Sequence, residues 1–234
     1  MLLNKTNLVL IFSVLAVSAC TSNEIGESKD VAQDKIFQQY SVKYTEGDEN
    51  VTVTGQFRFA GGNGTTLVLT KPSQLAFDDE VIKVDSSGAS GAYYQAKKAA
   101  SGFNGKHHFV FTDINNKKFD NDFDFQKFQL ANAPMEASKK SNLNIEFSPK
   151  TLNDGDYVEI KSANTDSSFS VRLDGKNDAG AIQIPAKELM RQKKGEVKLE
   201  VTLYRNVNLQ QNTAEGGSME IRYTLKPITV KLND

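Results

Sequence analysis

The sequence predicts an all-β protein in which two tandem antiparallel β-sandwich modules follow a polar leader. Two observations favour this fold class. Apolar residues alternate with polar ones in many short runs after residue 50, which is the period of a half-buried strand. Glycine, asparagine and proline residues separate these runs, and only residues 186–194 have a helical pattern. We expect residues 38–134 and residues 135–234 to form the two modules.

The first module begins with a run in which Val51, Val53, Phe57 and Phe59 alternate with polar residues. Residues 61–64, Gly-Gly-Asn-Gly, predict a tight hairpin turn because both residue types tolerate positive φ. The returning strand is expected at 65–70 and ends before a proline, and shorter strands are expected at 79–85, 92–97 and 106–112. Residues 117–131, with several phenylalanines, close the module.

The alternation stops at Ala133-Pro134, and residues 138–141 are polar, so we place a domain boundary at residues 133–141. The two modules are expected to be separable there by proteolysis. The second half contains seven short apolar-alternating runs with turns between them. That density of strands favours an immunoglobulin-like (Ig-like) sandwich.

Two segments carry a resemblance to known families. Residues 181–189 and 195–205 look like the strand, turn and strand of bacterial Ig-like repeats, and residues 57–67 look like a segment of uncharacterised bacterial lipoproteins. Neither resemblance brings known functional residues. The chain has no tryptophan and a single cysteine, so the cysteine–tryptophan–cysteine core of antibody domains is absent.

Residues 1–19 have the order of a secretory signal peptide: Lys5, an apolar run at 8–17 and two small residues before Cys20. The apolar run is shorter than the roughly 20 residues that a spanning helix needs. Val17-Ser-Ala-Cys20 resembles the lipobox of bacterial lipoproteins. The resemblance implies that the Cys20 thiol carries diacylglycerol and that a peptidase frees Cys20 as the first residue. An ordinary cleaved signal with a chance cysteine is the alternative.

Cys20 is the only cysteine, so the chain cannot form an internal disulfide. The polar stretch at residues 21–35 cannot bury a core, and we expect residues 20–37 to form a flexible lipidated tether. Thr21 resembles the residue found in lipoproteins that are sorted to the outer membrane. We therefore expect a lipid-anchored protein of the bacterial cell envelope, and we expect the anchoring membrane to be the outer one.

Composition and motifs argue against several function classes. Lys and Arg total 28 against 29 Asp and Glu, spread evenly along the chain, so nucleic acid is not an expected partner. His107 and His108 are the only histidines, and adjacent residues on a strand point to opposite faces. They are therefore not expected to share a metal ion. No Gly-x-Ser-x-Gly motif is present. We expect no enzyme activity, no cofactor and no metal.

Two short segments remain as candidate binding residues. Asp120, Asp122 and Asp124 share one face of an expected strand and could bind calcium weakly, or could simply form a solvated outer face. Tyr93 and Tyr94 could stack on sugars, or could divide between the core and the surface.

The sequence leaves three functions open. The first is a non-enzymatic lipoprotein that contacts another envelope component through the edges of the strands at 197–209 and 219–225 and the polar loop at 210–217. The second is a surface module that binds glycan or calcium. The third is an enzyme of an unrecognised kind.

Overall fold

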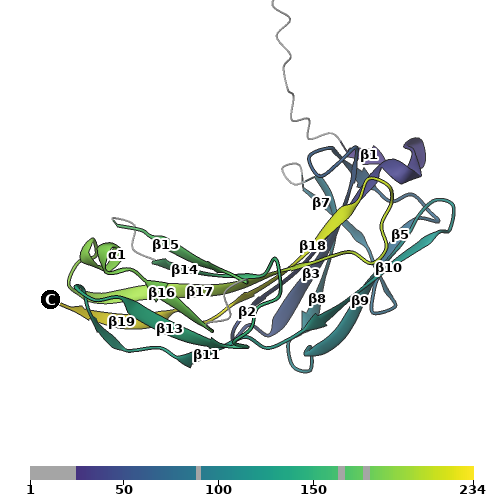
Figure 1. Cartoon of the computed structure of the whole chain (residues 1–234). Coiled ribbons are helices and arrows are strands. Elements are labelled where there is room, and N and C mark those ends of the chain that lie inside the picture. The colour runs from purple at the N-terminus through teal and green to yellow at the C-terminus, as the bar shows by residue number, and fades with distance from the viewer. Residues whose placement is uncertain (1–24, 88–90, 163–166, 176–179) are drawn as a thin grey trace, which may run out of the picture.

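A computed structural model describes residues 25–234 except 88–90, 163–166 and 176–179 (Figure 1). Almost all of the regular secondary structure in the described residues is β-strand, which confirms the predicted all-β fold class. The signal peptide expected at residues 1–19 and the expected lipid site Cys20 lie outside the described residues. None of the described helices is long and apolar enough to span a membrane. The strands are β1 (Ile25–Glu27), β2 (Ile36–Thr45), β3 (Asn50–Phe59), β4 (Thr65–Val68), β5 (Gln74–Phe77), β6 (Glu80–Ile82), β7 (Val84–Ser87), β8 (Gly91–Ala99), β9 (Gly105–Thr112), β10 (Lys118–Phe125), β11 (Gln129–Asn132), β12 (Glu136–Ser138), β13 (Leu143–Ser148), β14 (Tyr157–Ser162), β15 (Ser170–Asp174), β16 (Ala181–Ile184), β17 (Gly195–Val207), β18 (Gly217–Thr224) and β19 (Ile228–Asn233).

The described strands form three sheets. The largest has twelve strands, with the order β1-β4-β3-β2-β18-β17-β14-β15 along its main path and β7, β8, β12 and β19 attached to it. A four-stranded sheet, β10-β9-β5-β6, belongs to one lobe, and a three-stranded sheet, β11-β13-β16, belongs to the other. Figure 1 shows the two lobes set at an angle, with the large sheet running through both.

Aromatic rings fill the lobe that contains β9 and β10. Tyr40 and Phe57 of the large sheet are buried together with Phe109 and Phe111 of β9. The Tyr40 and Phe109 rings stack with centroids 4.7 Å apart, and the Phe57 and Phe111 centroids lie 4.5 Å apart. These contacts join the two sheets face to face, because inward-pointing side chains alternate with outward-pointing ones along each strand.

The two lobes share strands across the boundary expected at residues 133–141. β18 lies parallel to β2 through eight residue pairs, from Gly217–Gln38 to Thr224–Thr45. The Tyr223 ring of β18 packs 5.9 Å from Phe125 of β10. In the other direction, β11 pairs with β13, which places residues 129–132 with the second half. The boundary therefore does not separate the sheets, and the division into modules 38–134 and 135–234 stays a prediction.

The N-terminal segment is folded over much of the range expected to be a tether. β1 pairs in parallel with β4, and short 3-10 turns follow at Ser28–Asp30 and Gln33–Lys35. Ser28 is buried, and its hydroxyl oxygen accepts a hydrogen bond from the Thr70 backbone N–H at 2.8 Å. The prediction of a flexible tether up to residue 37 is thus wrong for residues 25–37. Polar side chains here satisfy backbone groups of the first lobe instead of extending into solvent.

Two expected elements differ in extent. The strand expected at 79–85 is divided at Lys83 into β6 and β7, which belong to different sheets. The helix expected at 186–194 is confined to α1, Ala186–Met190. Both differences arise because local alternation does not show where a chain crosses from one sheet to another or where a short helix ends.

Candidate functional site

The β9–β10 hairpin positions the acidic segment that the sequence singles out. Phe119, Phe123 and Phe125 are buried beneath β10, whereas the aspartates between them face outward. This arrangement matches the expected division between an apolar and an acidic face. The antiparallel register places His108 of β9 directly opposite Asp122.

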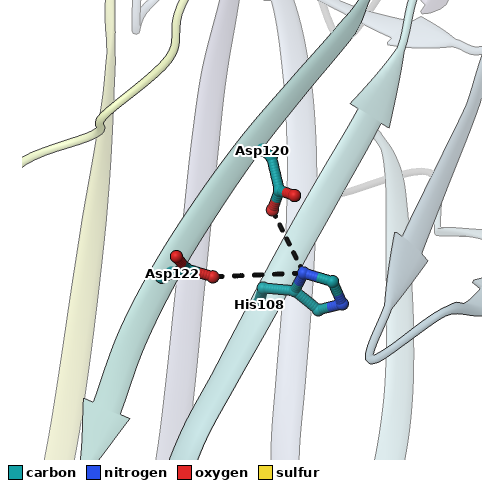
Figure 2. A group of neighbouring side chains, drawn as sticks. All are labelled: His108, Asp120 and Asp122. Carbon is teal, nitrogen blue, oxygen red and sulfur yellow. Dashed lines mark hydrogen bonds and ion pairs between the residues drawn. The ribbon is translucent and has the colours of Figure 1, made fainter.

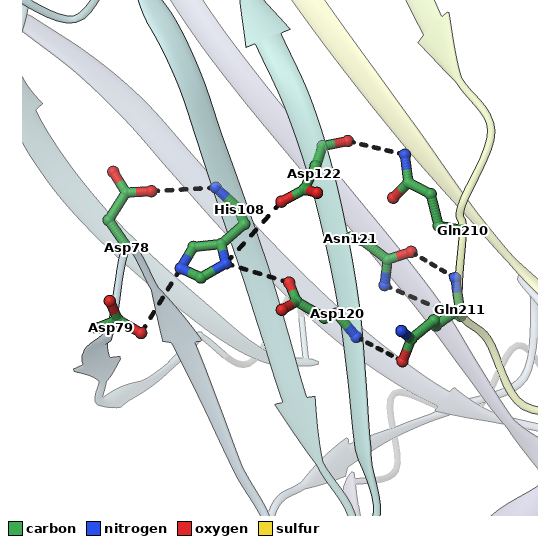
Figure 3. Close-up of polar contacts among 8 residues, drawn as sticks. All are labelled: Asp78, Asp79, His108, Asp120, Asn121, Asp122, Gln210 and Gln211. Atoms are coloured by element: carbon green, nitrogen blue, oxygen red, sulfur yellow. Dashed lines mark hydrogen bonds and ion pairs between the residues drawn. The ribbon is translucent and has the colours of Figure 1, made fainter.

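His108 joins two of the three aspartates in one cluster. Its Nδ1 lies 3.1 Å from Asp120 Oδ1 and 4.0 Å from Asp122 Oδ1 (Figure 2). Its Nε2 lies 3.6 Å from Asp79 Oδ1 (Figure 3). The ligand atoms of His108, Asp120 and Asp122 lie within 4.8 Å of one another. Asp124 instead accepts a hydrogen bond from Gln126 Nε2 at 2.7 Å. The membership of His108 in this cluster could have been predicted from the sequence, since a hairpin between residues 105–112 and 118–125 pairs His108 with Asp122.

The cluster is open to solvent. The Asp122 side chain is 78% exposed, Asp120 45% and His108 26%. An imidazole and two carboxylates could hold a cation weakly, but they also form ion pairs with each other whenever the imidazole is protonated. Weak calcium binding and a solvated outer face both stay open as alternatives for these aspartates.

His107 points to the opposite face of β9, as the sequence predicts. Its ring stacks on Phe103 with centroids 4.0 Å apart. Its Nδ1 lies 2.7 Å from Asp78 Oδ2, and its Nε2 lies 2.7 Å from the Phe103 carbonyl oxygen. Since both ring nitrogens have partners within the lobe, this histidine supports the aromatic core.

The loop expected to carry a contact surface is bonded to the β10 strand instead. Asn121 Oδ1 accepts a hydrogen bond from the Gln211 N–H at 3.0 Å, and Asn121 Nδ2 donates to the Gln211 carbonyl at 2.9 Å (Figure 3). Gln210 Nε2 donates to the Asp122 carbonyl at 3.0 Å. Moreover, β17 and β18 have paired neighbours on both sides. These strands offer no free edge over their paired residues, so the expectation of strand addition at 197–209 and 219–225 is wrong.

A polar groove lies on the outer face of the large sheet, where β18 and β2 join the lobes. Its volume is about 800 Å³, which is within the range of small-molecule and cofactor sites. Side chains of β2, β3, β8 and β18, with Asn206 of β17, line it. Its lining is rich in hydrogen-bonding groups: Gln39, Ser41, Lys43, Thr54, Gln56, Arg58, Tyr93, Gln95, Asn206, Ser218, Glu220 and Arg222, with Tyr40 and Met219.

Strand register arranges these side chains in rows across the sheet. One row contains Ser218, Gln39 and Gln56, and the next contains Glu220, Ser41, Thr54 and Gln95. A third row contains Arg222 and Lys43, which line the groove, and Thr52 and Lys97, which continue the row on the same face beyond the lining. Successive rows lie two residues apart along each strand, which is about 7 Å. Arg222 and Lys43 therefore lie at one end of the groove, and Gln39, Gln56 and Arg58 lie at the other.

Hydrogen bonds fix part of the groove in place. The Arg58 guanidinium donates to Gln56 Oε1 at 2.8 Å and to the Gly64 carbonyl at 2.9 Å. Gln56 Nε2 donates in turn to the Ala92 carbonyl at 3.2 Å. These amide and guanidinium groups are held before any ligand arrives, which lowers the entropic cost of binding.

The two adjacent tyrosines divide between the core and the surface, which is the second alternative that the sequence leaves open. Tyr94 is buried, and its hydroxyl oxygen accepts a hydrogen bond from the Leu69 N–H at 2.6 Å. Burial raises the pKa of Tyr94 above its ordinary value. Tyr93 is half-buried at the groove wall, and its side chain forms no hydrogen bond or ring stack with another residue in the described ranges. Its ring is therefore available to a ligand.

A stack of rings and guanidinium groups continues the cationic row beyond the groove. The Arg172 guanidinium lies 3.6 Å from the Tyr157 ring, which stacks on Tyr204 at 4.5 Å. The Arg222 guanidinium covers the other face of Tyr204 at 4.8 Å. Burial raises the pKa of both tyrosines. Because their ring faces are occupied, these tyrosines orient the arginines and do not offer sugar platforms.

Comparisons with known proteins give no family. No family model and no curated protein matches the chain. The similar solved structures include SGBP-B of the Bacteroides ovatus mixed-linkage glucan utilization locus, in complex with a mixed-linkage heptasaccharide. That match has 9% identity, covers 86% of this chain and 60% of that one, and has a TM-score of 0.26. This chain thus spans about three fifths of the length of SGBP-B.

Two further structures are similar at the same level. Murine CEACAM1b has 10% identity and a TM-score of 0.22, with 84% of this chain and 100% of that chain covered. Dpr11 IG1 bound to DIP-gamma IG+IG2 has 11% identity and a TM-score of 0.22, with 85% and 96% covered. Superpositions of this quality carry no argument about function, so the function has to be inferred from the groove itself.

Proposed function

We propose that this chain is a non-catalytic glycan-binding protein, held at a bacterial envelope membrane by lipid on Cys20. The groove at the junction of the lobes takes the sugar chain. The observation that carries the proposal is the half-buried Tyr93 ring, which has no partner among the described residues and stands beside fixed amide and guanidinium groups.

The chemistry of the groove fits carbohydrate. Sugars present many hydroxyl groups, each able to donate and accept hydrogen bonds, and planar amides and guanidinium groups bind them in pairs. Sugars also have apolar C–H faces, which pack on aromatic rings. Gln39, Ser41 and Ser218 have no side-chain hydrogen-bond partner in the described part of the chain and remain available. The groove thus combines fixed and free polar groups with one ring.

Binding to a glycan array, followed by calorimetry with the best oligosaccharide, tests this function. Tyr93→Ala and Gln39→Ala should each weaken binding by about tenfold, because each removes one contact worth about 1.4 kcal/mol. Gln183→Ala is a matched control, since Gln183 bonds Asn144 on the three-stranded sheet at 3.0 Å. The proposal fails if no glycan binds, or if the control weakens binding as much as the groove variants.

Contact with an envelope protein remains a second candidate because β15 lies at an edge of the large sheet. β15 pairs with β14 and has no other partner among the described strands, so its outer edge could accept a strand from another protein. Photo-cross-linking from Val171 in intact cells tests it. A specific protein adduct would support this route, and absence of an adduct from an abundant, folded protein would argue against it.

A further inference from the structure

We propose that the glycan is acidic and that the row of Lys43, Lys97 and Arg222 recognises its carboxylate or sulfate groups. This inference rests on the proposed function and names the ligand class of the same groove. Its basis is the set of charges that strand pairing brings together on the outer face of the large sheet.

The row concentrates positive charge. Lys43 is the register partner of Arg222 on β18, and on its other side Thr52 separates it from Lys97 of β8. Neighbouring strands lie about 4.8 Å apart, and like charges directly opposite each other are unfavourable. The side chains of Lys43 and Lys97 have no hydrogen bond or ion pair with another residue in the described ranges. An anion bound beside Lys43 would offset the repulsion between Lys43 and the neighbouring cations Arg222 and Lys97.

The groove lining is basic as a whole. Lys43, Arg58 and Arg222 line it, and Glu220 is the only acidic residue among its described lining residues. Glu220 Oε1 accepts a hydrogen bond from Arg222 Nη2 at 3.1 Å, so this carboxylate offsets one of the three cations. Two positive charges remain, and they favour an anionic ligand over a neutral one.

Arg222 is oriented before a ligand arrives. The Tyr204 ring covers its guanidinium at 4.8 Å, and Glu220 holds one of its terminal nitrogens. A guanidinium held in this way can present its remaining N–H groups to a carboxylate or sulfate, which it binds through two parallel hydrogen bonds. Lys43 then adds charge without fixed geometry.

The spacing of the groove sets the size of the ligand. Lys43 lies four residues from Gln39 on β2, which is about 13 Å at 3.3 Å per residue. Gln39 pairs with Gln56 of β3. The neighbouring residue Gly55 pairs with Tyr94 of β8, so Tyr93 lies beside Gln56, at the Gln39 end of the groove. The sugar ring that stacks on Tyr93 and the acidic group at Lys43 therefore belong to different sugar units, so the ligand is an oligosaccharide.

Calorimetry with uronate oligosaccharides and with their methyl esters tests the inference, because esterification removes the charge and keeps the backbone. The acids should bind at least about tenfold tighter than the esters, and added salt should reduce the difference. The double variant Lys43→Gln, Lys97→Gln should reduce the preference for the acid, and Arg222 should account for the part that remains. Lys187→Gln, on α1 in the other lobe, is the matched control and should leave it unchanged.

The outcomes separate the inference from the proposed function. If neutral glycans bind through Tyr93 as tightly as acidic ones, the acidic ligand class is wrong and glycan binding stands. If acids bind better but the double variant keeps the preference, another surface provides the selectivity and the assignment of the row is wrong. If no glycan of either kind binds, both proposals fall.

Discussion

β18, from the second half of the chain, pairs with β2 in the first half. We therefore predict that the first half cannot fold without β18. A fragment of residues 25–134, which ends at the boundary that the sequence favours, removes that strand. It retains β2 but lacks the eight residue pairs that β18 forms with it. Met219, Ile221 and Tyr223, whose side chains are buried in the intact chain, are also lost.

The size of the loss can be worked out from these three side chains. Burying Met219 and Ile221 stabilises the fold by about 1.5–3 kcal/mol each. Tyr223 packs against the rings of Tyr44, Phe125 and Phe128, and each ring contact contributes about 0.5–1.5 kcal/mol. Together they contribute about 5–10 kcal/mol, which is comparable to the whole stability of a domain of about 5–15 kcal/mol.

Circular dichroism with thermal melting measures the outcome. The fragment should show no cooperative transition, whereas the same fragment carrying residues 206–225 through a Gly-Ser linker should regain one. The linker must let β18 lie parallel to β2. A cooperative melt of the bare fragment, near the midpoint of the full chain, would show that β18 is dispensable and would support two separable modules.

Three further predictions concern single residues. Gly55→Ala should lower the free energy of unfolding, measured in urea, by about 1–3 kcal/mol, because the added Cβ would overlap Cδ2 of Leu75. Gly62→Ala is the control: its added Cβ would lie 3.4 Å from the nearest atom, on Phe37, and the loss should be less than about 0.5 kcal/mol. Equal losses in the two variants would contradict this. Burial raises the pKa of Asp156 above its ordinary value, so the stability from its protonated form is present below about pH 3.9 and is lost as pH rises through the raised pKa. As pH rises through the raised pKa, the free energy of unfolding of Asp156→Asn should therefore increase relative to that of the wild type. A decrease relative to the wild type would show that the sign is wrong. Cys20→Ser should release the protein from membranes or leave an uncleaved precursor, and unchanged fractionation and gel mobility would rule out the lipobox.

The faces of individual strands could be predicted from the sequence. Alternation in β10 separated Phe123 from Asp122, and the same rule separated His107 from His108. These predictions succeed because a strand's side chains alternate whatever its neighbours are.

Strand neighbours could not be predicted in the same way. Gly217 pairs with Gln38 across almost the whole chain, and no local pattern encodes that choice. The groove exists only through such pairings, since its rows combine β18, β2, β3 and β8. The cationic row could therefore not be predicted from the sequence, in which positive and negative charges are evenly spread. Tyr93 was recognisable as a candidate, whereas Lys43 and Lys97 were indistinguishable from ordinary surface lysines.

Glycan binding in the groove can be tested residue by residue with an NMR titration of the folded protein by an acidic oligosaccharide. We expect the Tyr93 ring signals and the backbone amides of β2, β3, β8 and β18 to shift together and saturate, while those of the β9–β10 hairpin stay unchanged. Saturable shifts centred on His108 and Asp122 instead, or no shifts at millimolar ligand, would contradict binding in the groove.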